Sequence, residues 1–379
     1  MINTQHPSRL RCRHAIALCC LTLLLVACST TGNAPTSTSG ILNGKGCLRV
    51  GILLPDTSTS DRWEAKDHPL LVQAVKQAIP GVQIDYNNAQ GSSDTQLSQA
   101  ETDLANNDCI LIVAPHDSVA AASIVQKALP YHVPVIAYDR LIQSKDTSYY
   151  VSFDGVAVGK LQGEYIARHY QAYTLPLEHA NVALINGSQT DTNALLFGEG
   201  VHQILDPLLV QGTLKNIYET FTPDWNDATA QTEMEVALAN LQNNIQIAYI
   251  ANDGMADSAI TALRIAHLNG RVLVTGQDAT VTGIHNILAG DQNMTVYKPI
   301  IKEAQSVGAV VKALYAGLST SSLTNGQTVP TVDGGSIMAI LDAPIEVDSS
   351  NIASTVLADH YVLQSQICVG IRAGTDGVC

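Results

Sequence analysis

The chain has 379 residues, with 20 Lys and Arg against 34 Asp and Glu, so its formal net charge is −14. Hydrophobic residues make up 46% of it, enough for real cores, which excludes a disordered chain. The length predicts about two domains of roughly 150 residues each. The acidic balance argues against nucleic-acid partners, because phosphate binding needs clustered Lys and Arg.

Residues 1–27 have the pattern of a secretory signal. Three arginines and no acid precede an apolar run at 15–27, which is too short to span a bilayer comfortably. The run ends Ala27-Cys28-Ser29, which resembles a bacterial lipobox, so we expect Cys28 to become the lipidated first residue of the mature chain. The alternative is an ordinary signal peptide with an incidental cysteine. The small Ala27 and the tract that follows favour the lipoprotein.

Residues 28–46 are predicted to form a flexible tether, since positions 29–46 contain seven Ser or Thr and four Gly. The expected location is outside the cytoplasm, with the protein held on the cell membrane by its lipid alone and facing the periplasm or the cell exterior. Later in the chain, no stretch approaches about 18 uninterrupted apolar residues.

Processing changes the charge and the cysteine count. Removal of residues 1–27 takes away three arginines and no acid, which leaves 17 basic and 34 acidic residues, a net charge of −17. Besides Cys28, four cysteines remain: Cys47, Cys109, Cys368 and Cys379. An even number in an exported chain predicts two disulfides, and three pairings are possible.

The body of the chain alternates short apolar strands with amphipathic helices. In the first half we expect strands at 50–54, 82–86, 110–114, 135–138 and 150–153. In the second half we expect strands at 182–186, 216–220, 247–251 and 272–275, with helices at 156–170, 193–209, 227–242 and 253–268. Repeated strand–helix–strand units predict an α/β fold of two doubly wound parallel-sheet lobes.

This fold selects one cysteine pairing. Cys47 and Cys109 each directly precede a predicted strand, the first and the third, which are neighbours in the order 2-1-3-4-5. We therefore expect Cys47 to pair with Cys109, at the end of the sheet opposite a ligand cleft, where the required separation of about 5.5–6 Å is within reach. Cys368 then pairs with Cys379.

Polar and aromatic side chains follow the predicted strands, where ligands of open parallel sheets bind. Carboxylates, amides and guanidinium groups suit sugar hydroxyls, and flat aromatic rings cover the apolar faces of a pyranose. Both tryptophans of the chain lie in such loops, one in each half. Such residues are Asp56, Asp61, Arg62 and Trp63 after the first strand, Tyr138, Asp139 and Arg140 after the fourth, and, in the second half, Asn186 to Asn193, Asp224-Trp225-Asn226, Asn252-Asp253, Gln277-Asp278 and Tyr297-Lys298-Pro299.

Several blocks in this order resemble the bacterial D-xylose-binding branch of the type I periplasmic sugar-binding protein family, which serves ABC transporters. They include Asp61-Arg62-Trp63, Ala137-Tyr138-Asp139-Arg140-Leu141-Ile142, Asp191-Thr192-Asn193-Ala194, Gly276-Gln277-Asp278-Ala279 and Met294-Thr295-Val296-Tyr297-Lys298-Pro299. The resemblance covers about residues 48–360. Loop 54–60 and His68-Pro69 depart from the family pattern, and residues 364–379 lie outside the resemblance.

The resemblance implies roles for the site residues. Trp63 and Trp225 would sandwich the sugar ring. The hydrogen-bonding residues would be Arg62, Asp139, Arg140, Asn193, Asn252, Asp278 and Lys298. It also implies an N-terminal lobe of residues 47–153 plus 298–341, a C-terminal lobe of 154–297 plus 342–367, and a terminal disulfide loop at 368–379. The chain should cross a three-segment hinge near 152–155, 294–298 and 341–345.

The resulting hypothesis is a binding protein that captures a monosaccharide, D-xylose or a similar pentose, and delivers it to an ABC permease as a monomer. No catalytic role, cofactor or metal is expected, since Asp139 and Asp278 have basic neighbours but no nucleophile partner and the histidines lack paired metal spacing.

Alternatives are a sugar-sensing module that serves a chemoreceptor or kinase, or a binder of another pentose or hexose. A repressor would need a DNA-binding head, and a secreted hydrolase is the weakest option. Each tryptophan could also be an ordinary core or rim residue.

Overall fold

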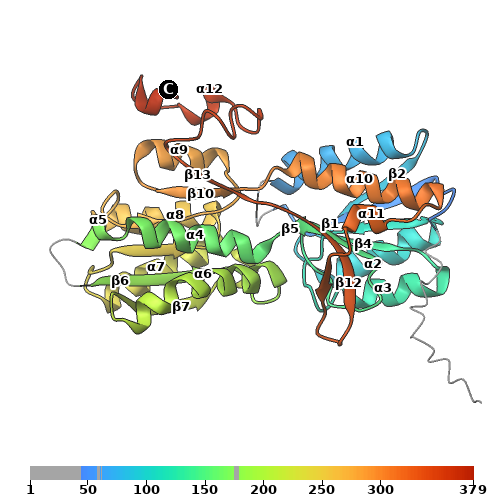
Figure 1. Cartoon of the computed structure of the whole chain (residues 1–379), viewed down its shortest axis with the longest axis horizontal. Helices are drawn as coiled ribbons and strands as arrows, with labels where there is room; N and C mark the ends of the chain where they lie inside the picture. Colours follow the sequence, from blue (N-terminus) through green and yellow to red (C-terminus); the bar gives the residue numbers. More distant parts are fainter. Residues whose placement is uncertain (1–43, 58–59, 61, 175–178) are drawn as a thin grey trace, which may run out of the picture. The chain divides into compact units, whose positions relative to one another are not determined.

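The computed structural model describes residues 44–57, 60, 62–174 and 179–379. The expected signal and Cys28 fall on residues 1–43, which lie outside the described residues. Within the described part, no helix combines the length and apolar character that a membrane crossing requires. The strands form a seven-stranded sheet, a four-stranded sheet and a two-stranded sheet (Figure 1).

The seven-stranded sheet organises the N-terminal lobe. Its order is β11-β12-β5-β4-β3-β1-β2, and every pair except β11–β12 is parallel. The section β2-β1-β3-β4-β5 has the predicted order. The strands are β1 (Arg49–Leu54), β2 (Gln83–Asn88), β3 (Ile110–Val113), β4 (Val135–Tyr138), β5 (Tyr149–Phe153), β11 (Thr328–Pro330) and β12 (Ser336–Asp342).

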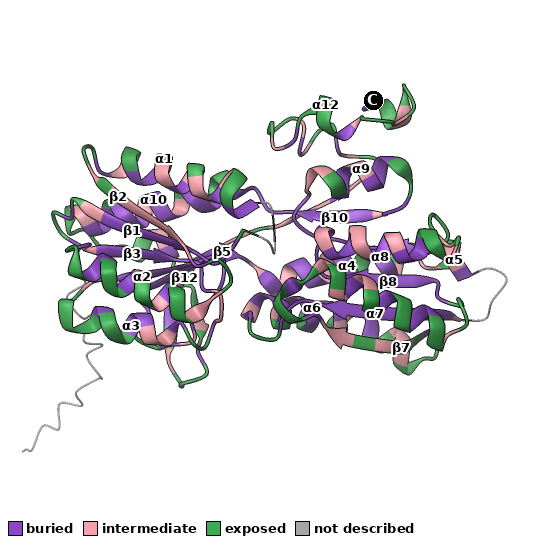
Figure 2. Ribbon diagram, turned by 180° about the vertical axis from the view of Figure 1, so that it is seen from behind, coloured by how far each residue is buried: buried purple, intermediate pink, exposed green. Residues whose placement is uncertain are grey.

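Helices cover both faces of this sheet. On one face α1 (His68–Ala78) packs beside α10 (Ile300–Ala316), and α2 (Ser93–Ala105) and α3 (Ala122–Ala128) lie on the other (Figure 1). Because side chains alternate along a strand, Ile52 of β1 joins the core under α1 and α10, whereas Leu53 joins the core under α2 and α3. Figure 2 shows the central strands β1 and β3 as buried, the edge strand β2 as intermediate and the outer faces of the helices as exposed.

The four-stranded sheet organises the C-terminal lobe in the order β7-β6-β8-β9, all parallel. Its strands are β6 (Ala180–Asn186), β7 (Leu214–Phe221), β8 (Ile247–Ile250) and β9 (Leu273–Val274). The helices are α4 (Gly155–His169), α5 (Gln171–Thr174), α6 (Thr192–Val210), α7 (Asp227–Asn240), α8 (Asp253–Ile265) and α9 (Val281–Ala289). The fold class is the predicted one.

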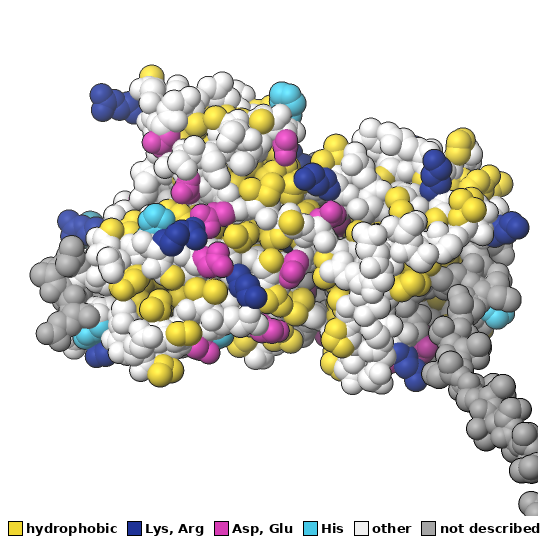
Figure 3. Space-filling model, in the orientation of Figure 1, with side chains coloured by type: hydrophobic (Ala, Val, Ile, Leu, Met, Phe, Trp, Pro, Cys, Tyr) yellow, Lys and Arg dark blue, Asp and Glu magenta, His cyan; other side chains and the backbone are white. Residues whose placement is uncertain are grey.

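The chain passes between the two lobes at three places. It leaves β5 for α4, leaves β10 (Met294–Tyr297) for α10, and leaves β12 for β13 (Ile345–Asp348). Strands β10 and β13 pair antiparallel and form the two-stranded sheet. Arg168 of α4 reaches Glu346 of β13 at 2.6 Å. The face shown in Figure 3 mixes acidic and basic side chains with hydrophobic ones.

The segment after β13 has little regular structure beyond α12 (Gln364–Ile367). It is nevertheless anchored, because Ile352, Val356 and Ile367 are fully buried in a cluster with Ile284 and Ile287 of α9. A short helix, α11 (Ser321–Thr324), follows α10 in the other lobe. At the start of the described chain, the Gly46 N–H donates to the Tyr315 carbonyl, so the end of the expected tether contacts α10.

The structure contains both predicted disulfides. Cys47 and Cys109 are joined with their Cα atoms 5.5 Å apart, and so are Cys368 and Cys379. The first bridge links the starts of the neighbouring strands β1 and β3, and the second closes the terminal loop beyond α12.

Candidate functional site

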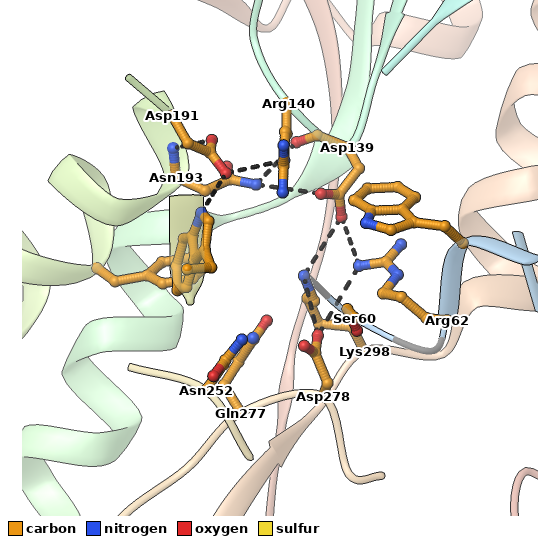
Figure 4. Close-up of a pocket in the computed structure, with 13 residues that line it drawn as sticks. Ser60, Arg62, Asp139, Arg140, Asp191, Asn193, Asn252, Gln277, Asp278 and Lys298 are labelled. Atoms are coloured by element: carbon orange, nitrogen blue, oxygen red, sulfur yellow. Dashed lines mark hydrogen bonds and ion pairs between the residues drawn. The ribbon is translucent and has the colours of Figure 1, made fainter. Parts of the chain in front are cut away.

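The carboxyl ends of strands from both sheets meet at one pocket. Its empty volume is about 300 Å³, and all nine residues predicted from the sequence line it. Ser60, Asp191, Phe197 and Gln277 complete its wall. Figure 4 shows the labelled polar side chains converging on a common space from several strands and loops. The complete lining is Ser60, Arg62, Trp63, Asp139, Arg140, Asp191, Asn193, Phe197, Trp225, Asn252, Gln277, Asp278 and Lys298.

Arg62 is held in a buried ion network within the N-terminal lobe. Its guanidinium donates to both oxygens of Asp67, at 2.9 and 2.7 Å, and its Nη1 donates to Asp139 Oδ1 at 2.7 Å. Nη2 also reaches Glu303 of α10 at 3.2 Å, and the Tyr138 hydroxyl donates to Asp67 at 2.6 Å. Burial alone would lower the pKa of Arg62, but these carboxylates outweigh it and raise the pKa well above its usual range. Arg62 is therefore a fixed cation.

Asp139 is the common anion of the pocket. Its carboxylate accepts from Arg62, from Lys298 Nζ at 3.3 Å and from Asn193 Nδ2 at 3.2 Å. Burial would raise the pKa of this carboxyl, but Arg62, Lys298 and Arg140 hold the pKa below its usual range. Its backbone carbonyl is also fixed, since it accepts the Ser152 hydroxyl at 2.7 Å. Asp139 stays ionised and presents acceptors to the cavity.

Lys298 joins the two lobes electrostatically. It follows β10 directly, is buried, and lies 3.3 Å from Asp139 Oδ1 and 3.5 Å from Asp278 Oδ1. One ammonium group therefore balances a carboxylate from each lobe. Asp278 Oδ1 is buried and makes no hydrogen bond within the described residues, so it keeps capacity to accept from a ligand.

Asp191 organises the opposite wall. It caps α6 by accepting the Asn193 N–H at 2.9 Å, and its Oδ2 binds Arg140 Nε at 2.8 Å and Trp225 Nε1 at 3.1 Å. Burial raises the pKa of this carboxyl, against the opposing effect of Arg140. Asp191 thereby orients a guanidinium from one lobe and an indole from the other.

The two tryptophans are both buried and both line the pocket. The guanidinium groups of Arg62 and Arg140 lie 4.8 and 5.1 Å from the Trp63 ring, at cation–π distance. Trp225 packs edge-on against Phe197 at 6.2 Å between ring centroids. A Cβ on Gly187 would lie 2.2 Å from the Trp225 ring, so only glycine allows that ring to lie so close to the end of β6.

Three pocket residues have left-handed backbone conformations. Asp139, Trp225 and Asp278 have φ angles of 57°, 53° and 99°. Non-glycine residues seldom adopt such angles, and strained positions gather at functional sites, where the surrounding contacts enforce them. In the loops after β4, β7 and β9, the surrounding contacts therefore hold the backbone in an unfavourable conformation that aims these three side chains.

Four lining residues were not among the predicted ligands, although each had a signal in the sequence. Asp191 and Gln277 follow predicted strands next to residues that were selected, and Phe197 lies on the same helix as Asn193. Ser60 lies in the loop after the first strand. Gln277 Oε1, like Asp278 Oδ1, is buried without a hydrogen-bond partner among the described residues.

The pocket is lined by charged, amide and aromatic groups. It lies between two doubly wound lobes that three chain segments link. This combination is typical of a ligand-binding protein of the periplasmic type. The family of periplasmic binding protein domains matches residues 50–319. The D-xylose-binding periplasmic protein of Haemophilus influenzae is 33% identical over 324 residues, which cover 84% of this chain and 92% of the relative. The chain belongs to the type I periplasmic sugar-binding protein family, and it is a binding protein and not an enzyme.

Other similar proteins are described with sugars other than D-xylose. The multiple sugar-binding periplasmic protein SbpA of Azospirillum brasilense is 32% identical, covering 84% of this chain and 90% of the relative. A solute-binding protein of Chloroflexus aurantiacus in complex with D-glucose superposes with a TM-score of 0.73 at 27% identity, covering 84% of this chain and 97% of that chain. An ABC transporter solute-binding protein of Clostridium phytofermentans with β-D-glucose gives 0.75 at 26% identity, covering 84% and 99%.

Proposed function

We propose that this protein is an exported, lipid-anchored solute-binding protein that captures D-xylose between its lobes and delivers it to an ABC permease. The observation that carries the proposal is the pocket in which charged, amide and aromatic side chains from both lobes converge. The relatives described as D-xylose-binding periplasmic proteins, from Haemophilus influenzae and Escherichia coli at 33% and 32% identity, support the choice of sugar.

The donor and acceptor pattern suits vicinal hydroxyls. Asp139 and Asp278 accept hydroxyl protons, and Arg140 and Lys298 donate to hydroxyl oxygens. Asn252 adds an amide from the carboxyl end of β8, where its Oδ1 also caps α8 by accepting the Met255 N–H. A dissociation constant near 1 μM needs about −8 kcal/mol, which a few charge-assisted hydrogen bonds and aromatic contact can supply.

Binding favours the closed arrangement of the lobes, because a ligand that contacts both lobes stabilises only the state in which both reach it. Asn193 of α6 already donates to Asp139 across the pocket, and Arg140 binds Asp191 in the same way. The closed protein, as a monomer tethered through Cys28, is what the permease recognises.

Calorimetric titration with D-xylose, L-arabinose, D-ribose and D-glucose tests the proposed ligand. We expect one D-xylose per chain, with micromolar or tighter affinity and at least tenfold preference over the other sugars. Absence of binding to every sugar by folded protein, or tighter binding of D-ribose, contradicts the proposal.

The anchor is tested separately: Cys28→Ser should move the protein from the membrane fraction to the soluble fraction, and unchanged fractionation contradicts lipidation.

A second candidate is a binder of several monosaccharides. It is supported by SbpA and by the multiple sugar-binding periplasmic receptor ChvE of Rhizobium radiobacter, which is 30% identical. The same titration separates the two, since a protein of broad specificity binds D-glucose within tenfold of D-xylose.

A further inference from the structure

Three aspartates of the N-terminal lobe gather away from the sugar pocket. Asp85 lies on β2, Asp103 on α2, and Asp108 just before β3. Each offers a carboxylate oxygen, and these oxygens all lie within 4.8 Å of one another. No sequence motif indicates this group, because its members come from three elements and meet only through the sheet order β2-β1-β3.

Gly51 of β1 makes room for the group. A Cβ at this position would lie 2.8 Å from Asp103 Oδ2 and 3.0 Å from Asp108 Oδ2. Two carboxylate oxygens therefore point at the same spot beside the β1 backbone. Gly51 pairs with Asp85 in the parallel register of β1 and β2, which brings the third carboxylate to the same level.

The local partners do not satisfy these carboxylates. Arg49 Nε donates to Asp85 Oδ2 and Asp108 Oδ1, both at 2.8 Å, and Asn87 Nδ2 donates to Asp103 at 3.0 Å. Asp108 Oδ2 has no hydrogen-bond partner within the described residues, and Asp108 is only 1% exposed. Three carboxylates and one guanidinium leave a formal charge of −2 at a largely buried place, which is costly without a counter-charge.

We propose that Asp85, Asp103 and Asp108 bind one divalent, oxygen-preferring cation, with Ca²⁺ as the ion. A divalent cation neutralises the remaining charge and gives Asp108 Oδ2 its missing partner. Carboxylates from irregularly placed elements suit Ca²⁺, which accepts about 6–8 oxygens in flexible geometry, whereas Mg²⁺ demands a near-ideal octahedron. The partly exposed Asp85 side chain gives the ion and its waters a route from solvent.

The site would stabilise the start of the N-terminal sheet. Asp108 directly precedes Cys109, whose disulfide with Cys47 joins β1 to β3, and Arg49 lies two residues after Cys47. An ion here adds a second link, among β2, α2 and the start of β3. Burial raises the pKa of Asp103 to about 6 and that of Asp108 to about 7, which agrees with carboxylates that lack sufficient counter-charge.

The test is calorimetric titration of CaCl2 into the purified full-length protein after dialysis against EGTA, followed by thermal unfolding. We expect one Ca²⁺ per chain and a rise in Tm on the order of 3 °C at saturation, with a smaller rise in equal MgCl2. Asp108→Asn and Asp103→Asn should abolish the binding. The control Glu235→Gln, which removes an exposed carboxylate from α7, should retain it.

The competing explanation is that Asp103 and Asp108 hold protons and no ion. In that case the folded state binds more protons than the unfolded chain, so stability falls as pH rises from about 4 to 7 and is indifferent to Ca²⁺. Absence of saturable Ca²⁺ binding by the wild type overturns the proposal, whatever the variants do. Equal binding by Asp108→Asn also overturns it. Sugar affinity is measured in parallel and is expected to be unchanged, which keeps this test independent of the proposed function.

Discussion

The two walls of the pocket are built on different principles. The wall from the N-terminal lobe is an ion network whose members mostly satisfy one another, with Arg62 bound to Asp67, Asp139 and Glu303. The wall from the C-terminal lobe has amides, and its buried acceptors Gln277 Oε1 and Asp278 Oδ1 lack hydrogen-bond partners within the described residues. Internal partners keep the first wall in place before a ligand arrives, whereas the second wall keeps two acceptors, on Gln277 and Asp278, that are free to bind a ligand.

The comparison predicts that substitutions in the first wall affect stability and affinity together, while those in the second affect affinity alone. Breaking a buried ion network leaves uncompensated charges even without ligand. Replacing Asp278 costs the folded protein less, because within the described residues its Oδ1 makes no hydrogen bond and only the longer ion pairs with Lys298 and Arg62, at 3.5 and 3.9 Å, are lost.

The largest effect is expected for Asp139→Asn. Arg62 and Lys298 lose their shared counter-charge, so the free energy of unfolding should fall by about 3 kcal/mol and D-xylose affinity by more than a hundredfold. Denaturant unfolding and calorimetry measure the two effects. The exposed Asp146→Asn is the control and should alter neither. Asp139→Asn with full stability would show that the network does not support the lobe.

Asp278→Asn is the matching change in the second wall. We expect affinity to fall about a hundredfold, equivalent to about 2.7 kcal/mol, because a charged acceptor of sugar hydroxyls is lost. The Tm should stay within about 2 °C, since Asp139 still pairs with Lys298. Asp224→Asn, exposed in the same lobe and also at positive φ, is the control. Unchanged affinity in Asp278→Asn would remove this residue from the site.

Trp225→Phe should have an intermediate effect. An aromatic ring is kept, but phenyl is smaller than indole and the N–H that donates to Asp191 Oδ2 is lost, so the wall around Arg140 loosens. We expect a loss of affinity of about tenfold, in line with one hydrogen bond to a charged group, measured by titration with D-xylose. Thermal unfolding serves as the folding control. A loss of less than twofold would mean that the indole N–H does not orient the pocket.

The smallest effect is expected for Tyr361→Phe. The Tyr361 hydroxyl donates to the backbone carbonyl of Asp278 at 3.2 Å, so it supports the strained backbone that aims this carboxylate. We expect a two- to fivefold loss of affinity, about 0.4–1 kcal/mol. Tyr131→Phe, on an exposed side chain, is the comparison. An effect as large as that of Asp278→Asn would place Tyr361 in direct contact with the sugar.

Local patterns were enough to predict most of the architecture. Alternating apolar strands and helices identified the parallel lobes, and the strand order then selected the Cys47–Cys109 bridge. The same rule gave a wider set of polar and aromatic residues, because the carboxyl end of a strand is visible in the sequence as the point where an apolar run ends. The resemblance to the sugar-binding family then selected nine of them.

Features that depend on distant partners could not be predicted in this way. Glu303 lies on α10, far along the chain from Arg62, and a charged residue on a helix is ordinarily read as solvent-facing. The segment after β13 lacks periodicity because it is mostly turns, yet it buries Ile352 and Val356 against α9. The positive φ angles of Asp139 and Asp278 could not be predicted either, since neither residue is glycine, the residue type that usually marks such angles.

The central claim is that one sugar contacts both walls at once, and the two tryptophans allow a direct test. The chain has only two, Trp63 and Trp225, and each lines the pocket from a different lobe. Trp63→Phe and Trp225→Phe therefore give two proteins whose tryptophan fluorescence reports from one wall each. Titration with D-xylose should change the emission of both proteins saturably, each at the midpoint that calorimetry gives for the same variant. Binding of the sugar in calorimetry with no change in the emission of one tryptophan would contradict the account.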